Sequence, residues 1–361
     1  MKSDHDALRQ VVSDILADNI EQARAEASKT GFSSTLWTTL GEGGFTTVIV
    51  PTDTGGAGGT LVDLATVLRT CGYHAAPVPL AETNAAAVLL ARAGLDIPLG
   101  PLAITDIAEQ PDCQIVGPAG SRRLVGVLHA VPWAAQAQRV VVAVQDVGQA
   151  FVGALSPADQ VMTPAVNIAG EPTADVSLDG GVRIVPLSEY AQPVPNTTAR
   201  ELVTLARCLL ITGSMRRVLA LSARYSRDRE QFGRSIGSFQ AVAHQLAQLA
   251  GAVEQADAIV DATVTASSAG QPVGELMLAA KVCTGQAAGL AIRIGHQIHG
   301  AIGVTEEFEL HHHTRRLMAW RDQGGSEVTA ARLLGRHIAE NGGRRLWELM
   351  TYQPDNPTRH T

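Results

Sequence analysis

The stretch RDREQFGRSIGSFQ, residues 227–240, places three arginines around a phenylalanine and two glycines. A guanidinium group can form two parallel hydrogen bonds with phosphate oxygens. Arginines in the last turn of a helix also stabilise the helix macrodipole, and a glycine such as Gly233 can end the helix. The arginines alone therefore leave two interpretations open, a phosphate site and a capped helix end.

Histidines are the second group of candidate residues, but their spacing does not favour a metal site. The run HHH at 311–313 would spread its side chains about 100° apart on a helix, so they cannot converge on one ion. His296 and His299 share a helix face without an evident third ligand. The four cysteines contain no CxxC pair. We therefore expect neither a metal site nor a disulfide framework.

Composition narrows the classes of partner. The 361 residues are 45% hydrophobic and 17% charged, which suits a protein with a large core. A formal net charge of -7 argues against a basic surface for nucleic acid or anionic lipid, so any phosphate must be bound locally. The amino-terminal segment is charged and amphipathic, unlike a signal peptide, and no apolar run is long enough to span a membrane. We expect a cytoplasmic protein without membrane insertion.

The sequence divides into three regions of different expected secondary structure, and these regions must position the candidate functional residues. Residues 1–99 are mostly helical by their apolar spacing, and Gly94 closes the last helix. Residues 100–195 contain β-favouring runs such as RVVVAV and VRIVPL, with QPVPN as the exit linker. Residues 196–361 return to longer helices. We predict an α+β fold with an N-terminal helical domain, a middle β domain and a C-terminal helical bundle.

One long helix of the third region has a narrow apolar seam. Its apolar residues recur at alternating spacings of four and three, which predicts packing along one face against a neighbour. The seam consists of Val242, Leu246, Leu249, Val253, Ala256 and Val260. Further helices are expected at 273–298, 306–321 and 326–340, with a break at HGAIG. Short connections between them favour an antiparallel bundle.

Two motifs of this bundle resemble those of the acyl-CoA dehydrogenase family. RYSRDREQFGRSIGSFQAVAHQLA looks like the family's bundle motif nearly residue for residue, and HQIHGAIGVTEE looks like its second. LWTTLGEGGFTTVIVPTDTGGAGG at 36–59 and APVPLAET at 76–83 are similar to its amino-terminal domain. The resemblance implies a flavoprotein with FAD as cofactor, built as a helical domain, a β domain and a helical bundle.

The resemblance also suggests a role for the arginine stretch. In this family the corresponding residues bind the FAD of the neighbouring subunit, not the chain's own. It implies that Arg229 binds the pyrophosphate and that Phe232 faces the adenosine end. Gln297 would add a hydrogen bond, and Gly300 would let the main chain approach phosphate. The motif spacing therefore favours the phosphate interpretation over a capped helix end.

The residues that face the chain's own flavin ring depart from the family pattern. The family cradles the ring with a loop of the type Thr-Glu-Pro-Gly-Ala-Gly-Ser, and the nearest match is AITDIAEQPD at 103–112. Thr105 matches the Thr and is a predicted cofactor contact, and Asp106 matches the Glu, but the Pro and the small residues are absent. The family's Trp-hydrophobic-Thr wall falls on Ala130–Pro132, without an aromatic shield or a hydroxyl. The same pattern would arise from sequence drift in a flavin site that is still used, or from a misalignment of these weakly similar strands.

The general base of the family's reaction is also absent from its usual positions. The family removes a proton from the carbon α to a thioester while hydride leaves the β carbon for the flavin, which requires a carboxylate. Alignment through AWRDQGGSE puts Gln323 at the position of the usual Glu, and the alternative position on the first bundle helix holds Val203. A Gln amide has no useful basicity. Asp322 could approach as an unusual base, whereas Glu201 would point about 200° away from Val203.

We therefore predict a non-catalytic partner subunit of a heteromeric acyl-CoA dehydrogenase. The pattern resembles the paired α2β2 enzymes of actinobacteria, which act on bulky CoA thioesters such as those of steroid side chains. It implies an acyl-CoA substrate, a homologous partner subunit with the catalytic Glu, and electron-transfer flavoprotein as a further partner. Two alternatives stay open: a self-sufficient homo-oligomeric dehydrogenase with a base such as Asp322, and a flavin-free scaffold protein.

Overall fold

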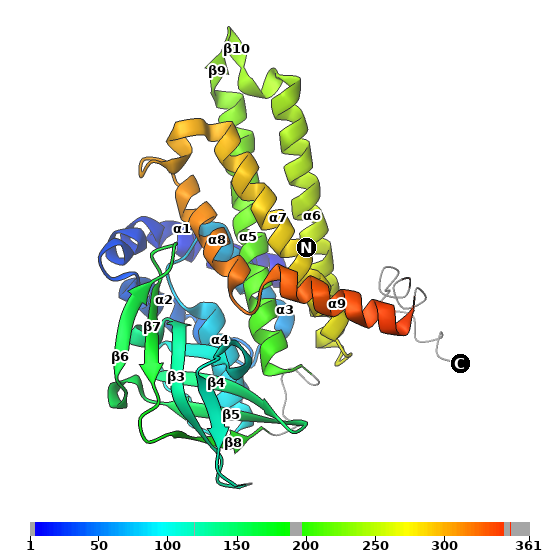
Figure 1. Ribbon diagram of the computed structural model, residues 1–361. Helices are drawn as coiled ribbons and strands as arrows, with labels where there is room; N and C mark the ends of the chain where they lie inside the picture. Colours follow the sequence, from blue (N-terminus) through cyan, green and yellow to red (C-terminus); the bar gives the residue numbers. More distant parts are fainter. Residues whose placement is uncertain (1–3, 119, 188–196, 343–346, 348–361) are drawn as a thin grey trace.

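The structure, a computed structural model, describes residues 4–118, 120–187, 197–342 and 347. Amino-terminal helices, a β-sheet and a bundle of long helices follow one another along the chain, as Figure 1 shows. The predicted α+β fold is thereby confirmed. The predicted linker QPVPN, residues 192–196, lies outside the described residues.

The amino-terminal region contains α1 (Asp4–Thr30), α2 (Ser34–Glu42), α3 (Leu61–His74) and α4 (Leu80–Arg92). Of these helices, α2 and α3 begin at side-chain caps that the sequence provides. The Ser33 hydroxyl accepts a hydrogen bond from the Leu36 main-chain N–H, and Thr60 and Asp63 form a reciprocal capping box. These caps satisfy N–H groups that the start of a helix leaves unpaired.

Valine-rich runs of the middle region form one sheet. Its strands are β1 (Leu102–Asp106), β2 (Cys113–Val116), β3 (Arg123–Pro132), β4 (Arg139–Asp146), β5 (Gln149–Leu155), β6 (Met162–Val166), β7 (Pro172–Ser177) and β8 (Val182–Pro186). The order is β1-β4-β5-β8-β3-β7-β6, with β2 paired to β3. β1 runs parallel to β4, and the other pairs are antiparallel. Buried side chains of these strands form a core of their own.

Strand β3 contains a bulge that shapes the cavity described below. Its register with β7 shifts between Leu128 and Val131. Ala130, inside the bulge, has a φ of 47°. This left-handed conformation is unfavourable for a residue with a Cβ, so the surrounding contacts must hold it.

The third region is the predicted helical bundle. It contains α5 (Ala199–Asp228), the hairpin strands β9 (Glu230–Gln231) and β10 (Arg234–Ser235), then α6 (Gln240–Ser268), α7 (Gly274–His299), α8 (Leu310–Asp322) and α9 (Glu327–Asn341). The seam residues of α6 are buried from Leu249 onward, while Val242 and Leu246 are only partly buried. The break at HGAIG is a short 3-10 turn, Gly300–Val304. α8 starts at Leu310, later than predicted.

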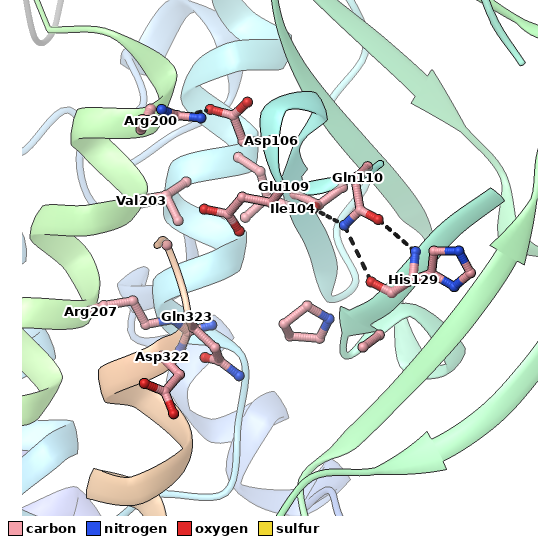
Figure 2. A pocket seen from close by; sticks show the side chains of 14 residues that line it. Ile104, Asp106, Glu109, Gln110, His129, Arg200, Val203, Arg207, Asp322 and Gln323 are labelled. Carbon is pink, nitrogen blue, oxygen red and sulfur yellow. Dashed lines mark hydrogen bonds and ion pairs between the residues drawn. The ribbon is translucent and has the colours of Figure 1, made fainter. Parts of the chain in front are cut away.

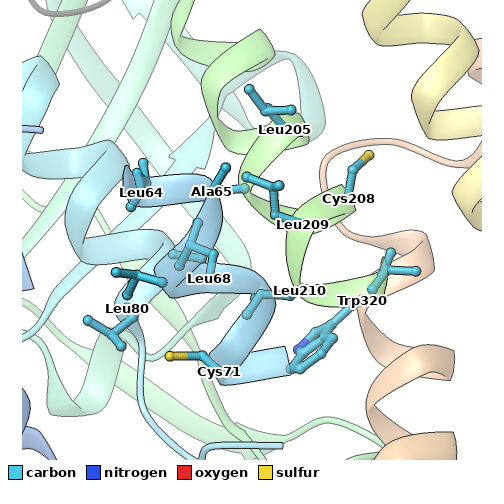
Figure 3. Close-up of a cluster of buried hydrophobic side chains, with 14 of the residues drawn as sticks. Leu64, Ala65, Leu68, Cys71, Leu80, Leu205, Cys208, Leu209, Leu210 and Trp320 are labelled. Carbon is cyan, nitrogen blue, oxygen red and sulfur yellow. The ribbon is translucent and has the colours of Figure 1, made fainter. Parts of the chain in front are cut away.

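Helices α3 and α5 cross with their main chains in contact. A Cβ added to Gly72 would lie 2.1 Å from the Leu210 carbonyl oxygen, and one added to Gly213 would lie 2.0 Å from the Arg69 carbonyl oxygen. Only glycine permits this approach. Leucines on both sides of the crossing pack into one core that joins the amino-terminal helices to the bundle (Figure 3).

Candidate functional site

Helix α5 ends before a tight β-hairpin, not at a glycine cap. The helix ends at Asp228, and β9 and β10 pair around a loop of two residues. Those residues, Phe232 and Gly233, have φ values of 56° and 76°. Positive φ at both positions is typical of the type I′ turn that joins short hairpins. The prediction that Gly233 ends the helix is therefore wrong, because this glycine permits the turn.

The β9–β10 hairpin lies at the outer end of the bundle, as Figure 1 shows. It exposes an aromatic ring and a guanidinium group. The Phe232 side chain is 93% exposed. The Arg234 guanidinium lies over the Phe239 ring, 4.2 Å from its centroid, in a cation–π contact. Arg229 is exposed and forms no ion pair within the described part of the chain. Its guanidinium is therefore available for an anion.

The second motif lies at the same end of the bundle. The rings of Tyr225 on α5 and His299 on α7 stack with their centroids 4.6 Å apart, which holds the two helix ends together. Gln297 is exposed. Gly300 has a φ of 61°, and a Cβ added there would meet no atom within 4 Å. Both motifs thus lie at the same end of the bundle, where Arg229, Gln297 and Gly300 are exposed.

A cavity of about 200 Å³ lies at the opposite end of α5, between the sheet and the bundle (Figure 2). Thr105 lines it from the loop predicted to hold a flavin, and Ala130 and Pro132 line it from the predicted wall. Val203 and Gln323, the two positions where the family places its base, line the same cavity. The residues selected from the family pattern therefore converge on one place.

Val203 and Gln323, at the two positions where the family places its base, carry no carboxylate. The Gln323 side-chain oxygen is buried without a hydrogen-bond partner in the described residues. Its main-chain oxygen accepts a hydrogen bond from the Lys281 ammonium group. Asp322 also lines the cavity but is exposed. Glu201 lies outside the cavity, and its carboxylate accepts a hydrogen bond from the Thr198 main-chain N–H at 2.8 Å.

Sequence reasoning missed Glu109. It belongs to a 3-10 turn, Ile107–Glu109, and Figure 2 shows its carboxylate directed into the cavity. Desolvation by the cavity walls raises the pKa of this carboxyl, and the Asp106 carboxylate adds to the rise. Counting from Thr105, Glu109 stands where the family loop has its Ala. That departure is the signal in the sequence that could have revealed it.

The arginines of the cavity are already paired with carboxylates. Arg207 is 4% exposed and forms an ion pair with the buried Glu82. Arg200 bonds Asp106 at 2.9 Å. Since a buried charge is stable only with a partner, the Arg207 guanidinium must stay bound to Glu82. The cavity therefore differs from the hairpin, where Arg229 is unpaired among the described residues.

A second cavity, of about 520 Å³, adjoins the first and shares Glu109, Arg200 and Gly324 with it. Lys281 lines this second cavity with only 2% of its surface exposed. Burial lowers the pKa of its ammonium group. Lys281 thus connects the second cavity to the loop that contains Gln323.

The implied FAD fits this chain at one end only. The Thr105 hydroxyl oxygen accepts a hydrogen bond from the Gln110 amide at 2.8 Å, and Ala130 and Pro132 offer the flavin ring neither stacking nor a donor. The ring therefore does not fit. The pyrophosphate end fits the hairpin, where Arg229 is exposed and unpaired among the described residues.

Two further findings concern metal and membrane. Within the residues that the structure describes, no group of three or more His, Cys, Asp or Glu side chains could hold a metal ion. No helix in the same residues is long and apolar enough to cross a membrane.

Comparison with known proteins identifies the family. Residues 2–96 match the family model "Acyl-CoA dehydrogenase, N-terminal domain", and residues 198–339 match "Acyl-CoA dehydrogenase, C-terminal domain". Acyl-CoA dehydrogenase IpdE2 of Mycobacterium tuberculosis is 28% identical over 315 residues, which cover 86% of this chain and 89% of the relative.

Solved structures agree with these matches. The Tcur3481-Tcur3483 steroid ACAD G363A variant is 25% identical, with a TM-score of 0.84 over 93% of this chain and 98% of its own. The ChsE4-ChsE5 complex from Mycobacterium tuberculosis has the same fold, with a TM-score of 0.84 at 22% identity over 95% of this chain and 99% of its own. Acyl-CoA dehydrogenases are FAD-dependent flavoproteins. The fold, the two motifs and these matches together place the chain in the acyl-CoA dehydrogenase family.

Proposed function

We propose that this chain is a non-catalytic subunit of a heteromeric, FAD-dependent acyl-CoA dehydrogenase, and that it binds the pyrophosphate end of the FAD held by a partner subunit. The observation that carries the proposal is a contrast within one chain. At one end of the bundle, four residues are exposed: Arg229, Phe232, Gln297 and Gly300. The cavity at the other end lacks a flavin wall and the usual base.

The division of labour follows from the chemistry of the reaction. Desaturation of a CoA thioester requires a carboxylate against the α carbon, and FAD, when bound, supplies the hydride acceptor. Gln323 and Val203 occupy the two positions where the family places that carboxylate, and neither can accept a proton at neutral pH. The base therefore comes from a homologous partner subunit that carries the Glu, while this chain binds and orients the cofactor.

The substrate class rests on the similar proteins. One of the similar solved structures is a steroid ACAD, and another is a complex of two differently named chains. By analogy we assign to the assembly a bulky, steroid-type acyl group on CoA, with electron-transfer flavoprotein as electron acceptor.

The flavin content of purified protein tests the proposal. Expressed alone, the chain retains little FAD, because its cavity lacks a ring wall. Co-expressed with a partner that has an intact flavin loop and Glu, it yields about one FAD per two chains in an α2β2 assembly. Near-stoichiometric FAD on the lone chain would contradict the proposal, and a colourless complex would favour the scaffold alternative.

A self-sufficient dehydrogenase is a second candidate because Glu109 places a carboxylate of raised pKa in the cavity. A positioned base is worth about 10²–10⁴ in rate. The variant Glu109→Gln distinguishes the two functions in a dye-reduction assay of the purified assembly. Under the subunit proposal Glu109 is not the base, so the turnover of this variant stays within about tenfold of wild type. Loss of a catalytic base would lower turnover by more than this.

A further inference from the structure

Gln110 lies in the wall of the smaller cavity with only 6% of its surface exposed. Counting from Thr105, the Gly-Ala-Gly of the family's flavin loop becomes Ala108, Glu109 and Gln110. Two long polar side chains thus replace a methyl group and a hydrogen where the family leaves room for a ring.

The Gln110 amide connects two strands across the end of the cavity. Its Nε2 donates to the Thr105 hydroxyl oxygen at 2.8 Å and to the His129 carbonyl oxygen at 3.2 Å. Its Oε1 accepts a hydrogen bond from the His129 main-chain N–H at 2.6 Å. Both its donor and its acceptor side are therefore bound to the protein, which fixes the side chain between β1 and β3.

The β3 bulge is fixed from its other side as well. The Ala130 N–H donates to Asp175 Oδ1 at 2.7 Å. The His129 ring lies between two carboxylates, with Nε2 at 2.8 Å from Asp112 and Nδ1 at 3.3 Å from Asp175. Residues 129–130 therefore cannot move away from Gln110 without loss of several hydrogen bonds.

We propose that Gln110 and Glu109 together form a built-in plug that closes the cavity of this chain to the isoalloxazine ring. Gln110 fills the ring space and donates a hydrogen bond to the Thr105 hydroxyl oxygen, and Glu109 adds a carboxylate to the remaining volume. The inference rests on the proposed function and explains why the flavin ring belongs to the partner subunit alone.

Binding of lumiflavin, an isoalloxazine without phosphates, tests the plug. The purified chain and its Glu109→Ala/Gln110→Ala variant are titrated, with flavin fluorescence quenching as the readout. We expect the dissociation constant of the variant to be at least tenfold lower than that of the wild type. Gln138→Ala is the matched control, because Gln138 also bonds a main-chain N–H, that of Gly100 at 3.2 Å, but lies outside the cavity. We expect this control to bind as the wild type does.

A double variant that keeps its fold by circular dichroism and melting temperature but binds lumiflavin no better than the wild type overturns the plug. Should the double variant fail to fold, Glu109→Ala alone decides, with at least a threefold gain expected and no gain contradicting the inference. Tight binding by the wild type also overturns it. The subunit function is judged separately, by the flavin content of the lone chain and of the co-expressed complex.

Discussion

The Arg229 guanidinium is exposed at the base of the β9–β10 hairpin and unpaired among the described residues. Arg229→Ala should lower the affinity of the assembled enzyme for FAD by roughly thirty- to a hundredfold, because a charge-assisted bidentate contact is lost. The measurement is FAD retained after dialysis of the complex. Arg224→Ala is the control, since Arg224 lies one turn earlier and is paired with Asp228 at 3.5 Å. Unchanged retention in an assembled Arg229 variant would mean that Arg229 does not bind the pyrophosphate.

The residues at the usual base position are expected to be dispensable. Gln323→Ala and Asp322→Asn should each leave turnover of the complex within roughly tenfold of wild type, because only a hydrogen bond or local packing is lost. Removal of the partner's Glu should lower the turnover of the complex by a factor of about 10²–10⁴. Turnover is measured with an artificial electron acceptor. If Asp322→Asn alone eliminates turnover while FAD stays bound, the base lies in this chain.

Individual residues differ in how far the sequence predicts them. The positions of Arg229 and Gln323 follow from motifs of fixed spacing, so sequence comparison alone locates them. The parts played by Glu109 and Gln110 depend on which main-chain groups of β3 come within reach of the loop after β1. The distance between this loop and β3 is set by the bulge at Ala130, and no local pattern in the sequence encodes it.

At the scale of helices, the crossing of α3 and α5 makes a steric prediction. Gly72→Ala should lower the free energy of unfolding by at least about 1–3 kcal/mol, because the new methyl group meets main-chain oxygen. Gly251→Ala in α6 is the control, since a Cβ there meets nothing within 4 Å. Alanine at this helical position should be neutral or stabilise by about 0.5–1 kcal/mol. Urea denaturation of the lone chain measures both, and equal stability of the two variants would contradict the close crossing.

At the scale of strands, His129 makes the β3 bulge sensitive to pH. Hydrogen bonds to Asp112 and then to Asp175 raise the pKa of His129 above its ordinary value. Because the pKa of His129 is higher in the folded chain, protonated His129 stabilises the fold. This stabilisation is complete below about pH 6.5, the pKa of the unfolded chain, and is lost as pH rises through the folded pKa. His129→Gln should abolish this loss of stability on the alkaline side. Denaturation series from about pH 5.5 to 8.5 on both proteins, a window that brackets the ordinary histidine pKa, measure the difference, and parallel profiles would contradict it.

Elements with a strong periodic pattern are predicted well by the sequence, and exposed or short ones are not. The seam of α6 and the valine-rich strands β4 and β8 follow from apolar spacing. β6 has mostly exposed side chains, which leave no apolar alternation to read. The sequence indicates an end of α5 at Gly233 because a glycine after arginines usually caps a helix, but here the same glycine serves a hairpin turn.

At the scale of the molecule, the order of the three regions is predictable because the family motifs lie in two of them. How the regions meet is not, because the contact between α3 and α5 depends on two glycines, Gly72 and Gly213, that are far apart in the sequence. The sequence also does not show that the exposed hairpin and the cavity lie at opposite ends of the same helix, α5. Only the structure reveals this contrast.

Helix α5 has 30 residues, and Val203 at the cavity lies about 40 Å along it from Arg229 at the hairpin. One copy of the chain therefore cannot apply both ends to a single cofactor. If each FAD is held by two chains, its retention obeys mass action. Dilution of the complex below its assembly constant should release flavin, and excess lone chain should restore it. Fluorescence of released flavin follows the exchange, and retention independent of concentration would mean that the partner holds FAD unaided.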